Sequence, residues 1–599
     1  MDGHRIATVR ERDPPYITPP IKVLLRRRNK LLRQGKADSA LAITKKVGKM
    51  IADVKSKLLS KATASDTKQL WQLLRSTRNW SSRVNSVSVS DAIGSTVTAE
   101  GLNAHFANIA TDPNYSRDNI EDCLCCIDGN DLSSFVPFSE YFLTIVLSRI
   151  RPTSPGPEGI PFWLYRTCAP ELGPIVAKLV NFSLSQHTVP RVWKTAHVTS
   201  VPKTSPVTGY GDLRPISVTS ILSRTVEKLV VKNYLTSVLD CPLFHDQYAY
   251  KPTGSTTCAL VDFTYRIHML LESNQYVRCI LIDFSKAFDM VDHAILARKL
   301  FSLQVPGFII HWIISFLTDR TQATKLGLSL STLLFINRSI VQGSGIRPTL
   351  FIMFAHDLKP LDMSNYLLKY ADDATLLSPQ NSPTPVELEM AHVMHWAREN
   401  KMSLNLLKTV ELVFRRPNVS GDLLPPALPD INRVCDAKLL GVYFRHDFNF
   451  SKHVESVVAI CNQRLYLLAQ LKKQGLGIRA LDSVFNAIVL NKILYALPVY
   501  FGYLTEGHKD MLRRVLKRAN RMGFTYYGYD LDHLNETSQY KLFRRCRSER
   551  HCLHHLFTVK PRPPGAMHLR QRGHDFVLPN IRYEFNKRHF IARALFDYV

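Results

Sequence analysis

Two adjacent carboxylates, Asp372 and Asp373, stand between two short apolar runs in the sequence LLKYADDATLL at residues 367–377. Each run has the length of a buried strand, so the segment predicts a β-hairpin with both acids at its tip. Carboxylates side by side in apolar surroundings are costly unless a cation balances them, and clustered hard oxygen ligands suit Mg²⁺. A metal-binding turn is therefore indicated, although an ordinary Asp-Asp turn explains the four-residue match equally well.

A third acid, Asp283, ends an almost continuous apolar run at residues 277–282. Such a run is typical of a central strand buried on both faces, with the carboxylate at its C-terminal end. Neighbouring strands lie about 4.8 Å apart. If this strand pairs with the hairpin, Asp283 and Asp372 converge on one small volume. That volume fits two metal ions about 3.5–4 Å apart, as in two-metal phosphoryl transfer.

Two β-like runs at residues 197–203 and 213–219 predict a second hairpin, with Lys203 near one end and Arg214 near the other. Such a pair can hold a triphosphate, Arg through its bidentate fork and Lys as a point charge. Surface salt bridges are the alternative explanation of both side chains.

A glycine-rich turn at residues 341–346 precedes a predicted helix and contains Gln342 and Gly343. Backbone amides at the start of a helix suit an incoming anion or a closely packed nucleotide.

The composition favours a multidomain globular protein with a polyanionic partner. The chain has 599 residues, 45% hydrophobic and 21% charged, and 77 Lys and Arg against 50 Asp and Glu give a net charge of +27. This excess favours nucleic acid as the partner. A membrane is the alternative, but we expect none, because the strongest apolar run, residues 308–317, is far shorter than the roughly 18 residues of a spanning helix.

The 11 cysteines are an odd number in a large chain, and reduced thiols are expected. A zinc site can be drawn from five residues near the C-terminus, but no CxxC spacing supports it. These residues are Cys546, His551, Cys552, His554 and His555.

Four regions are expected along the chain. Residues 1–80 form a basic, helical lead-in, and residues 81–149 form a linker or N-terminal extension. Residues 150–450 contain the acidic motifs, and residues 451–599 are mostly helical with basic clusters.

Taken in order, these motifs resemble the reverse transcriptase of non-LTR (LINE-type) retrotransposons. Any one motif is weak, but six or more in the family's order are specific. The matching sequences are SPGPEGIP at 154–161, LRPIS at 213–217, IDFSKAFD at 282–289, QGS at 342–344, YADD at 370–373, LN and KT between 404 and 409, and LLGV at 439–442.

The resemblance implies an α+β right-hand polymerase with fingers, a palm built on an antiparallel sheet and a helical thumb, plus the basic helical N-terminal region. It implies that Asp283 and Asp372 hold two Mg²⁺ ions, which Mn²⁺ can replace, with Asp373 in a supporting role. Phe288 matches the position where a bulky ring crowds a ribose 2′-OH, and core packing is its alternative role. The other residues implied in nucleotide binding are Lys203, Arg214, Gln342, Gly343 and Lys408, and those of a primer grip are Leu440, Gly441 and Val442.

The partners implied are an RNA template, a DNA primer or nicked target DNA, and dNTPs, while the oligomeric state is left open. An intracellular location, as a nuclear or cytoplasmic ribonucleoprotein, is expected. The endonuclease that usually precedes this polymerase, and a following ribonuclease H pattern, are not evident in the sequence. In addition, Arg347 stands where the family commonly has a small residue.

These departures suggest an alternative, a catalytically inactive, truncated copy that acts only as a basic RNA-binding protein. A group II intron maturase is a second alternative, and an RNA-directed RNA polymerase is disfavoured by Phe288.

Overall fold

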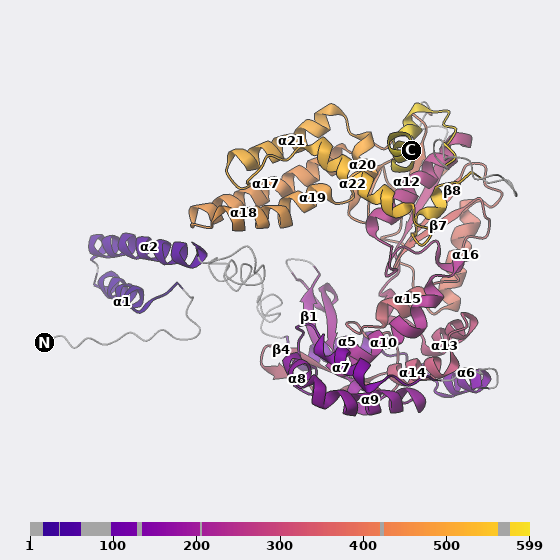
Figure 1. Cartoon of the computed structure of the whole chain (residues 1–599), viewed down its shortest axis with the longest axis horizontal. Helices are drawn as coiled ribbons and strands as arrows, with labels where there is room; N and C mark the ends of the chain where they lie inside the picture. Colours follow the sequence, from indigo (N-terminus) through magenta and orange to yellow (C-terminus); the bar gives the residue numbers. More distant parts are fainter. Residues whose placement is uncertain are drawn as a thin grey trace.

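The computed structural model describes residues 16–34, 36–60, 97–128, 135–203, 207–417, 419, 424–560 and 576–599. The predicted hairpins and helices form two five-stranded sheets, a small two-stranded sheet and a helical C-terminal part. In Figure 1 the first sheet and its helices lie at the bottom, the second sheet lies on the right, and the C-terminal helices extend from the top of that column.

The first sheet has the strand order β2-β1-β4-β5. Strand β5 pairs with the end of β4, and β6 pairs with its beginning. Strands β1 and β2 form the antiparallel hairpin predicted for residues 197–219, with Val201 opposite Arg214. Its strands are β1 (Thr195–Pro202), β2 (Leu213–Val218), β4 (Arg320–Leu326), β5 (Ser329–Leu330) and β6 (Leu334–Ile336). The surrounding helices are α5 (Ala99–Ile109), α6 (Asp118–Asp128), α7 (Glu140–Ser148), α8 (Phe162–Thr167), α9 (Ala169–Ser185), α10 (Ile221–Val230), α11 (Thr236–Leu239) and α14 (Gly307–Leu317).

The second sheet has the order β10-β9-β3-β8-β7, so the acid-bearing strand β3 is central, as predicted. Its pairs are antiparallel except β10 with β9 at one edge, which is parallel. Its strands are β3 (Tyr276–Ile282), β7 (Tyr366–Tyr370), β8 (Asp373–Pro379), β9 (Val410–Arg415) and β10 (Asn432–Arg433). The accompanying elements are α12 (Thr256–Ser273), α13 (His293–Ser302), α15 (Arg347–Phe354), α16 (Val386–Glu399), β11 (Asp436–Leu439) and β12 (Val442–Arg445).

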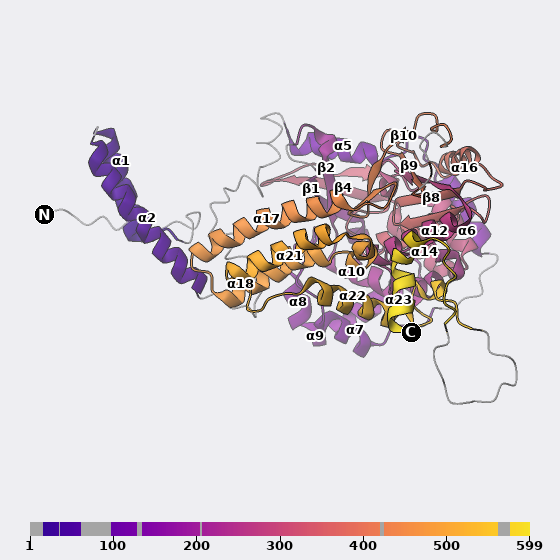
Figure 2. The same ribbon diagram turned by 90° about the horizontal axis from the view of Figure 1, so that it is seen from above.

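The C-terminal part is helical, as the sequence predicts. Helices α17, α18 and α21 run alongside one another in both ribbon views (Figures 1 and 2). Their apolar faces share one core with α12 and the second sheet, so this part is anchored to the sheet. The helices are α17 (Ser451–Lys473), α18 (Ile478–Phe485), α19 (Asn491–Leu494), α20 (Leu497–Tyr500), α21 (Glu506–Arg521), α22 (Leu531–Cys546) and α23 (Phe590–Tyr598).

The region predicted as a linker or N-terminal extension, residues 81–149, contains helices α5, α6 and α7 within its described part, and they pack into the protein. The N-cap of α5 is Thr98, whose side chain accepts the Gly101 N–H, and buried Leu102 and Phe106 pack near β1. Buried Leu143 of α7 lies in the same core as the strand β3. Of the two readings offered for this region, the packed helices favour an N-terminal extension over residues 97–128 and 135–149, while its standing as a separate region stays a prediction.

The basic lead-in forms two packed helices, α1 (Pro19–Arg33) and α2 (Ala37–Ser60), in which Ile21, Ala40 and Val47 are buried. Figure 2 shows this helix pair projecting away from the sheets. The part of the lead-in at residues 1–15 and 61–80 lies outside the described residues.

The expectation that no apolar run reaches the length of a membrane span is wrong, because one helical segment is long enough and apolar enough to cross a membrane. Residues Ile478–Tyr503 pass that test, but 61% of the apolar window is buried inside the protein. Helix α18 continues through a π-helical segment, Asn486–Leu490, into α19, and a turn at residues 495–496 precedes α20. The segment packs in the core shared with α12. Residues 478–503 therefore form core helices of the C-terminal part.

Candidate active site

Asp283 directly follows β3, and the pairing of Ile282 with Ala374 sets it beside Asp373 on the neighbouring strand. Its backbone is held from the other side: the N–H donates to Thr409 Oγ1 (3.3 Å), and the carbonyl accepts the Asn405 N–H (2.8 Å). The Leu-Asn and Lys-Thr motif thus fixes the position from which Asp283 projects. The predicted convergence of the acids is confirmed at the level of the backbone.

The turn that carries Asp372 joins β7 to β8, with Tyr370 opposite Asp373. Ala371 adopts a left-handed conformation with φ of 59°, which needs local support. Buried Gln247 supplies it, because its Oε1 accepts the N–H groups of both Ala371 (3.0 Å) and Ala249 (2.9 Å). Sequence reasoning missed Gln247, since it lies more than a hundred residues before the turn.

Two of the three carboxyl groups, those of Asp372 and Asp373, have raised pKa values. Burial raises the pKa of Asp372, and repulsion from Asp283 adds to this effect, whereas Arg347 and Arg214 oppose it. Desolvation, together with repulsion from Asp372 and Asp283, raises the pKa of Asp373 to about 6. Part of the Asp373 side chain faces solvent, so repulsion from the neighbouring carboxylates is the contribution that a bound cation would relieve.

The donor set fits a divalent metal. It consists of carboxylate oxygens at the ends of two paired strands, next to a cavity of about 320 Å³ that Asp283, Asp373 and Lys408 line. Hard oxygen ligands around an open volume are what Mg²⁺ and Mn²⁺ sites require. Burial and mutual repulsion raise the pKa of Asp372 and of Asp373, and a divalent cation would favour the ionised form of both.

Cationic side chains surround the acids. Lys203 donates to the Gly211 carbonyl (2.8 Å). Burial lowers the pKa of Lys203, and repulsion from Arg214, Lys286 and Lys408 lowers it further. Arg214, opposite Val201 in the β1–β2 hairpin, is exposed and lies within electrostatic range of Asp372. The structure thus brings the predicted phosphate-binding cations to the side of the acids.

Phe288 is half-buried and packs on Phe351, with ring centres 4.1 Å apart. It follows Asp283 through a turn in which Lys286 has a left-handed backbone. Packing in the core and partial exposure therefore coexist at this position. The role of Phe288 in sugar selection stays a prediction.

Gln342 and Gly343 lie where the loop before α15 crosses β2. The Gln342 carbonyl accepts the Ser217 N–H (2.7 Å). Gly343 has a φ of 114°, and a Cβ there would lie 2.2 Å from the Ser217 carbonyl oxygen. Glycine is required because two backbones approach closely, so this loop joins the first sheet to the second.

The residues implied in the primer grip lie in a hairpin. Strands β11 and β12 form a hairpin, in which Leu439 pairs with Val442. The turn residues Leu440 and Gly441 have φ values of 45° and 87°, and Leu440 O accepts the Tyr495 hydroxyl (2.6 Å). Two residues with positive φ require a tight turn, which an apolar pattern alone does not reveal.

Comparison with known proteins identifies the fold. Residues 201–444 match the sequence model of the family "Reverse transcriptase (RNA-dependent DNA polymerase)". The antiparallel strands that carry Asp283 and the Asp372–Asp373 turn lie within these matched residues, and the mixed helices and sheets fit a reverse transcriptase-like polymerase fold. The resemblance to non-LTR retrotransposon enzymes is also confirmed, since the relatives are polymerases of such elements. Reverse transcriptases generally use divalent metal ions.

One relative is the "Probable RNA-directed DNA polymerase from transposon BS" of Drosophila melanogaster, 24% identical over 58% of this chain and 40% of that protein. Another is the "Retrovirus-related Pol polyprotein from type-1 retrotransposable element R2" of Popillia japonica, 25% identical over 64% of this chain and 55% of that protein. The chain thus matches about two fifths to just over half of these relatives' lengths. Among solved structures, apo telomerase from Candida tropicalis aligns with a TM-score of 0.34 at 10% identity, covering 61% of this chain and 68% of that chain.

Proposed function

We propose that this chain is an RNA-directed DNA polymerase of a non-LTR retrotransposon, which adds dNTPs to a primer 3′-hydroxyl under the direction of an RNA template. The observation that carries the proposal is the position of Asp283 beside the Asp372–Asp373 turn on paired strands of an antiparallel sheet. A reverse transcriptase family match over the same residues supports it.

Each group in the site has a distinct task in this proposal. Asp283 and Asp372 would hold two Mg²⁺ ions, with Asp373 in a supporting role. Ions held there would supply the Lewis-acid chemistry that activates a primer hydroxyl and stabilises a leaving pyrophosphate. Lys203 and Arg214 bind the triphosphate, while the Phe288 ring excludes a ribose 2′-hydroxyl. Lys408 lines the same cavity as Asp283 and contributes a further positive charge. The turn Leu440–Gly441, with Val442, holds the primer end against this cavity.

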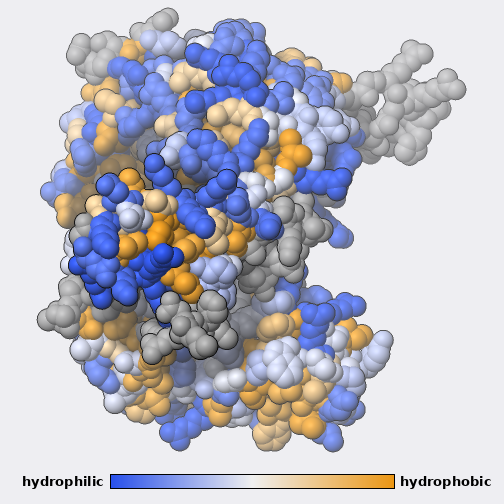
Figure 3. Space-filling model, turned by 90° about the vertical axis from the view of Figure 1, so that its left-hand side faces the viewer, coloured by the Kyte–Doolittle hydropathy of each residue, from blue (hydrophilic) through white to orange (hydrophobic). Residues whose placement is uncertain are grey.

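The C-terminal helices provide a surface for the template–primer duplex. A cavity of about 690 Å³ between α17 and α21 is lined by apolar Val458, Met511 and Val515 and bordered by cations. These cations are Arg514, Lys517, Arg518 and Arg521. Figure 3 shows hydrophilic side chains over much of one face, with an indentation between its upper and lower parts. Cations along a helix bind phosphates without sequence preference and in a salt-dependent manner.

The proposal is tested by primer extension on poly(rA)/oligo(dT) with dTTP and Mg²⁺. We expect incorporation by the unaltered chain, and loss of incorporation with retained RNA binding in Asp283→Ala and Asp372→Ala. Asp532→Ala is a matched control, because this carboxylate lies on α22 and pairs with Arg513. Extension that persists in both palm variants would refute the metal assignment.

The same experiment distinguishes the second candidate function, an inactive RNA-binding protein, which Arg347 at a position of usually small residues favours. In that case the folded chain binds RNA and incorporates no nucleotide. Binding by either form should weaken with salt, and substitution of Lys517 and Arg518 by Gln should reduce the salt slope by about one per lost phosphate contact. Arg513→Gln on the same helix should not, since Arg513 already pairs with Glu506, Asp510 and Asp532.

A further inference from the structure

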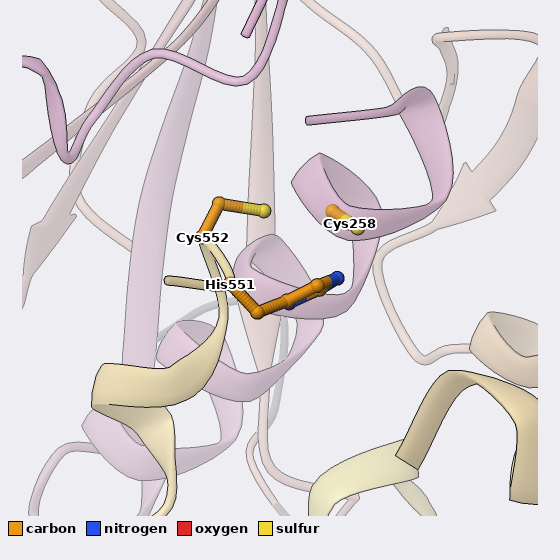
Figure 4. Close-up of side chains that lie close together, drawn as sticks. All are labelled: Cys258, His551 and Cys552. Carbon is orange, nitrogen blue, oxygen red and sulfur yellow. The ribbon is translucent and has the colours of Figure 1, made fainter. Parts of the chain in front are cut away.

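Cys258, His551 and Cys552 converge at the start of helix α12, and none of them belongs to the acidic site. Each offers one ligand atom, and the three atoms all lie within 4.8 Å of one another. Figure 4 shows Cys258 on helix α12 and the other two on the turn that follows α22, with a ring nitrogen of His551 directed toward Cys258. Cys258 and His551 are buried and Cys552 is partly buried. We propose that these three side chains bind a zinc ion that ties the C-terminal segment to the palm.

The ligand chemistry selects zinc over the metal of the acidic site. Two sulfurs and one imidazole are soft and intermediate ligands, which suit Zn²⁺ and do not suit Mg²⁺. Zinc sites of the Cys and His type take these residues as thiolates and a neutral ring. The two sites therefore differ in the ion that they accept.

The surroundings of Cys258 favour a thiolate. It is the third residue of α12, where unpaired N–H groups of the first helical turn stabilise negative charge. The Ser255 hydroxyl lies 3.1 Å from the Cys258 sulfur and donates to it, while the same oxygen accepts the Cys258 N–H. Hydrogen bonds to a metal-binding sulfur orient it and tune its affinity.

The backbone around residue 253 positions the second sulfur. The Cys552 N–H donates to Thr253 Oγ1 (3.0 Å). Both thiols point at the Thr253 carbonyl, from 3.3 Å for Cys552 and 3.7 Å for Cys258. The two sulfurs are already close together because both thiols donate to the same carbonyl oxygen. Zinc binding would release the protons of both thiols.

His551 can bind through Nε2. Its Nδ1 accepts the Leu553 N–H at 3.2 Å, so the neutral ring carries its proton on Nε2. Zinc at Nε2 replaces that proton, and the ring proton moves to Nδ1, which gives up the bond to Leu553. The cost is one hydrogen bond to a backbone amide.

A fourth coordination position is available. Cys258 and His551 line a cavity of about 230 Å³ that also borders Lys541, Arg545 and Leu494. A site with three protein ligands and a water in the fourth position is an established zinc geometry, and the cavity gives the ion an access route.

The remaining residues of the zinc site drawn from the sequence have other partners. His554 Nδ1 lies 3.1 Å from the Cys546 carbonyl, and the His555 ring stacks on His245 with centres 5.8 Å apart. The structure retains His551 and Cys552 and adds Cys258. That residue lies almost 300 positions earlier, so no local spacing could reveal it.

The experiment is to purify the full chain, saturate it with zinc chloride, remove unbound metal by gel filtration and measure bound zinc by mass spectrometry. We expect about one zinc per folded chain, and a loss of at least tenfold in zinc affinity for Cys258→Ser and Cys552→Ser. Cys461→Ser is the matched control, because Cys461 is a buried thiol of α17 and should leave zinc content unchanged.

Cobalt substitution provides a second readout on variants whose circular dichroism shows that they are folded. A sulfur-to-cobalt charge-transfer band in the near ultraviolet that halves when one cysteine is replaced supports two thiolate ligands. Unchanged zinc content in both cysteine variants, or a Cys258–Cys552 disulfide in the chain purified without reductant and no zinc uptake after reduction, would overturn the proposal. Neither readout depends on polymerase activity.

Discussion

The guanidinium carbon of Arg347 lies 4.4 Å from the centre of the Phe288 ring. Arg347 is itself held by the Ile340 carbonyl (2.9 Å) and by Asp289 (3.5 Å). The large side chain at this position is therefore ordered against the loop beside the acidic site. It supports the ring whose position the family resemblance links to sugar selection, through a contact between a cation and an aromatic face.

Replacement of Arg347 by Ser should loosen Phe288 and leave the carboxylate of Asp289 without its cation. Both side chains of this ion pair are largely buried, with 12% and 19% exposed, so we expect the free energy of unfolding to fall by about 1–3 kcal/mol. Ribonucleotide incorporation relative to deoxyribonucleotide should rise toward that of Phe288→Ala. Denaturant unfolding and single-nucleotide extension measure the two effects. Unchanged discrimination in both variants would assign Phe288 to core packing alone.

Replacement of Gly343 by Ala should destabilise the junction between the two sheets. The new Cβ would meet the Ser217 carbonyl at 2.2 Å, on a backbone with φ of 114°. Gly159→Ala is the matched control, since its φ is 70° and nothing lies within 4 Å of the added Cβ. Left-handed backbone alone costs about 1–2 kcal/mol. A larger loss of unfolding free energy for Gly343→Ala than for Gly159→Ala is expected in urea titrations, and equal losses would exclude the clash as the cause.

The sequence predicted the central strand, the acidic hairpin and the hairpin with Lys203 and Arg214 because each has a strong local pattern. Apolar runs of strand length that are bounded by turn residues predict strands and hairpins. The family resemblance then supplied the order in which these pieces assemble. The roles of individual site residues, and the location as a ribonucleoprotein, stay predictions.

Contacts between distant segments were not predictable from the sequence. Gln247 supports the turn at Ala371, and Cys258 meets Cys552, across long sequence separations that no periodicity encodes. The helices at residues 97–128 could not be placed from the sequence, because short amphipathic faces between polar residues give a weak signal. The turn at Leu440 is not visible in the apolar pattern, because two apolar strands joined by a two-residue turn resemble one continuous run.

Replacement of Gln247 by Ala should displace the turn that carries Asp372. It removes the acceptor of two buried N–H groups, those of Ala249 and Ala371, and each unsatisfied donor costs about 1–3 kcal/mol. We expect lower stability and a reduced kcat with little change in RNA affinity. Gln247→Glu keeps an acceptor oxygen and should recover part of both losses. A variant with reduced stability but full kcat would show that the turn does not need Gln247 for its geometry.

The elevated carboxyl pKa values predict a stability that depends on both pH and Mg²⁺. Asp373 ionises at about pH 6 in the folded chain and near 3.8 in the unfolded chain. The folded state therefore holds more protons between these values, and stability should fall as the pH rises from about 4 to above 6. Bound Mg²⁺ favours the ionised carboxylates and should restore stability at pH 7 but much less at pH 5. Urea unfolding at the two pH values, with and without Mg²⁺, tests this. Asp373→Asn should reduce the dependence on pH, and an identical dependence in variant and parent would mean that another group causes it.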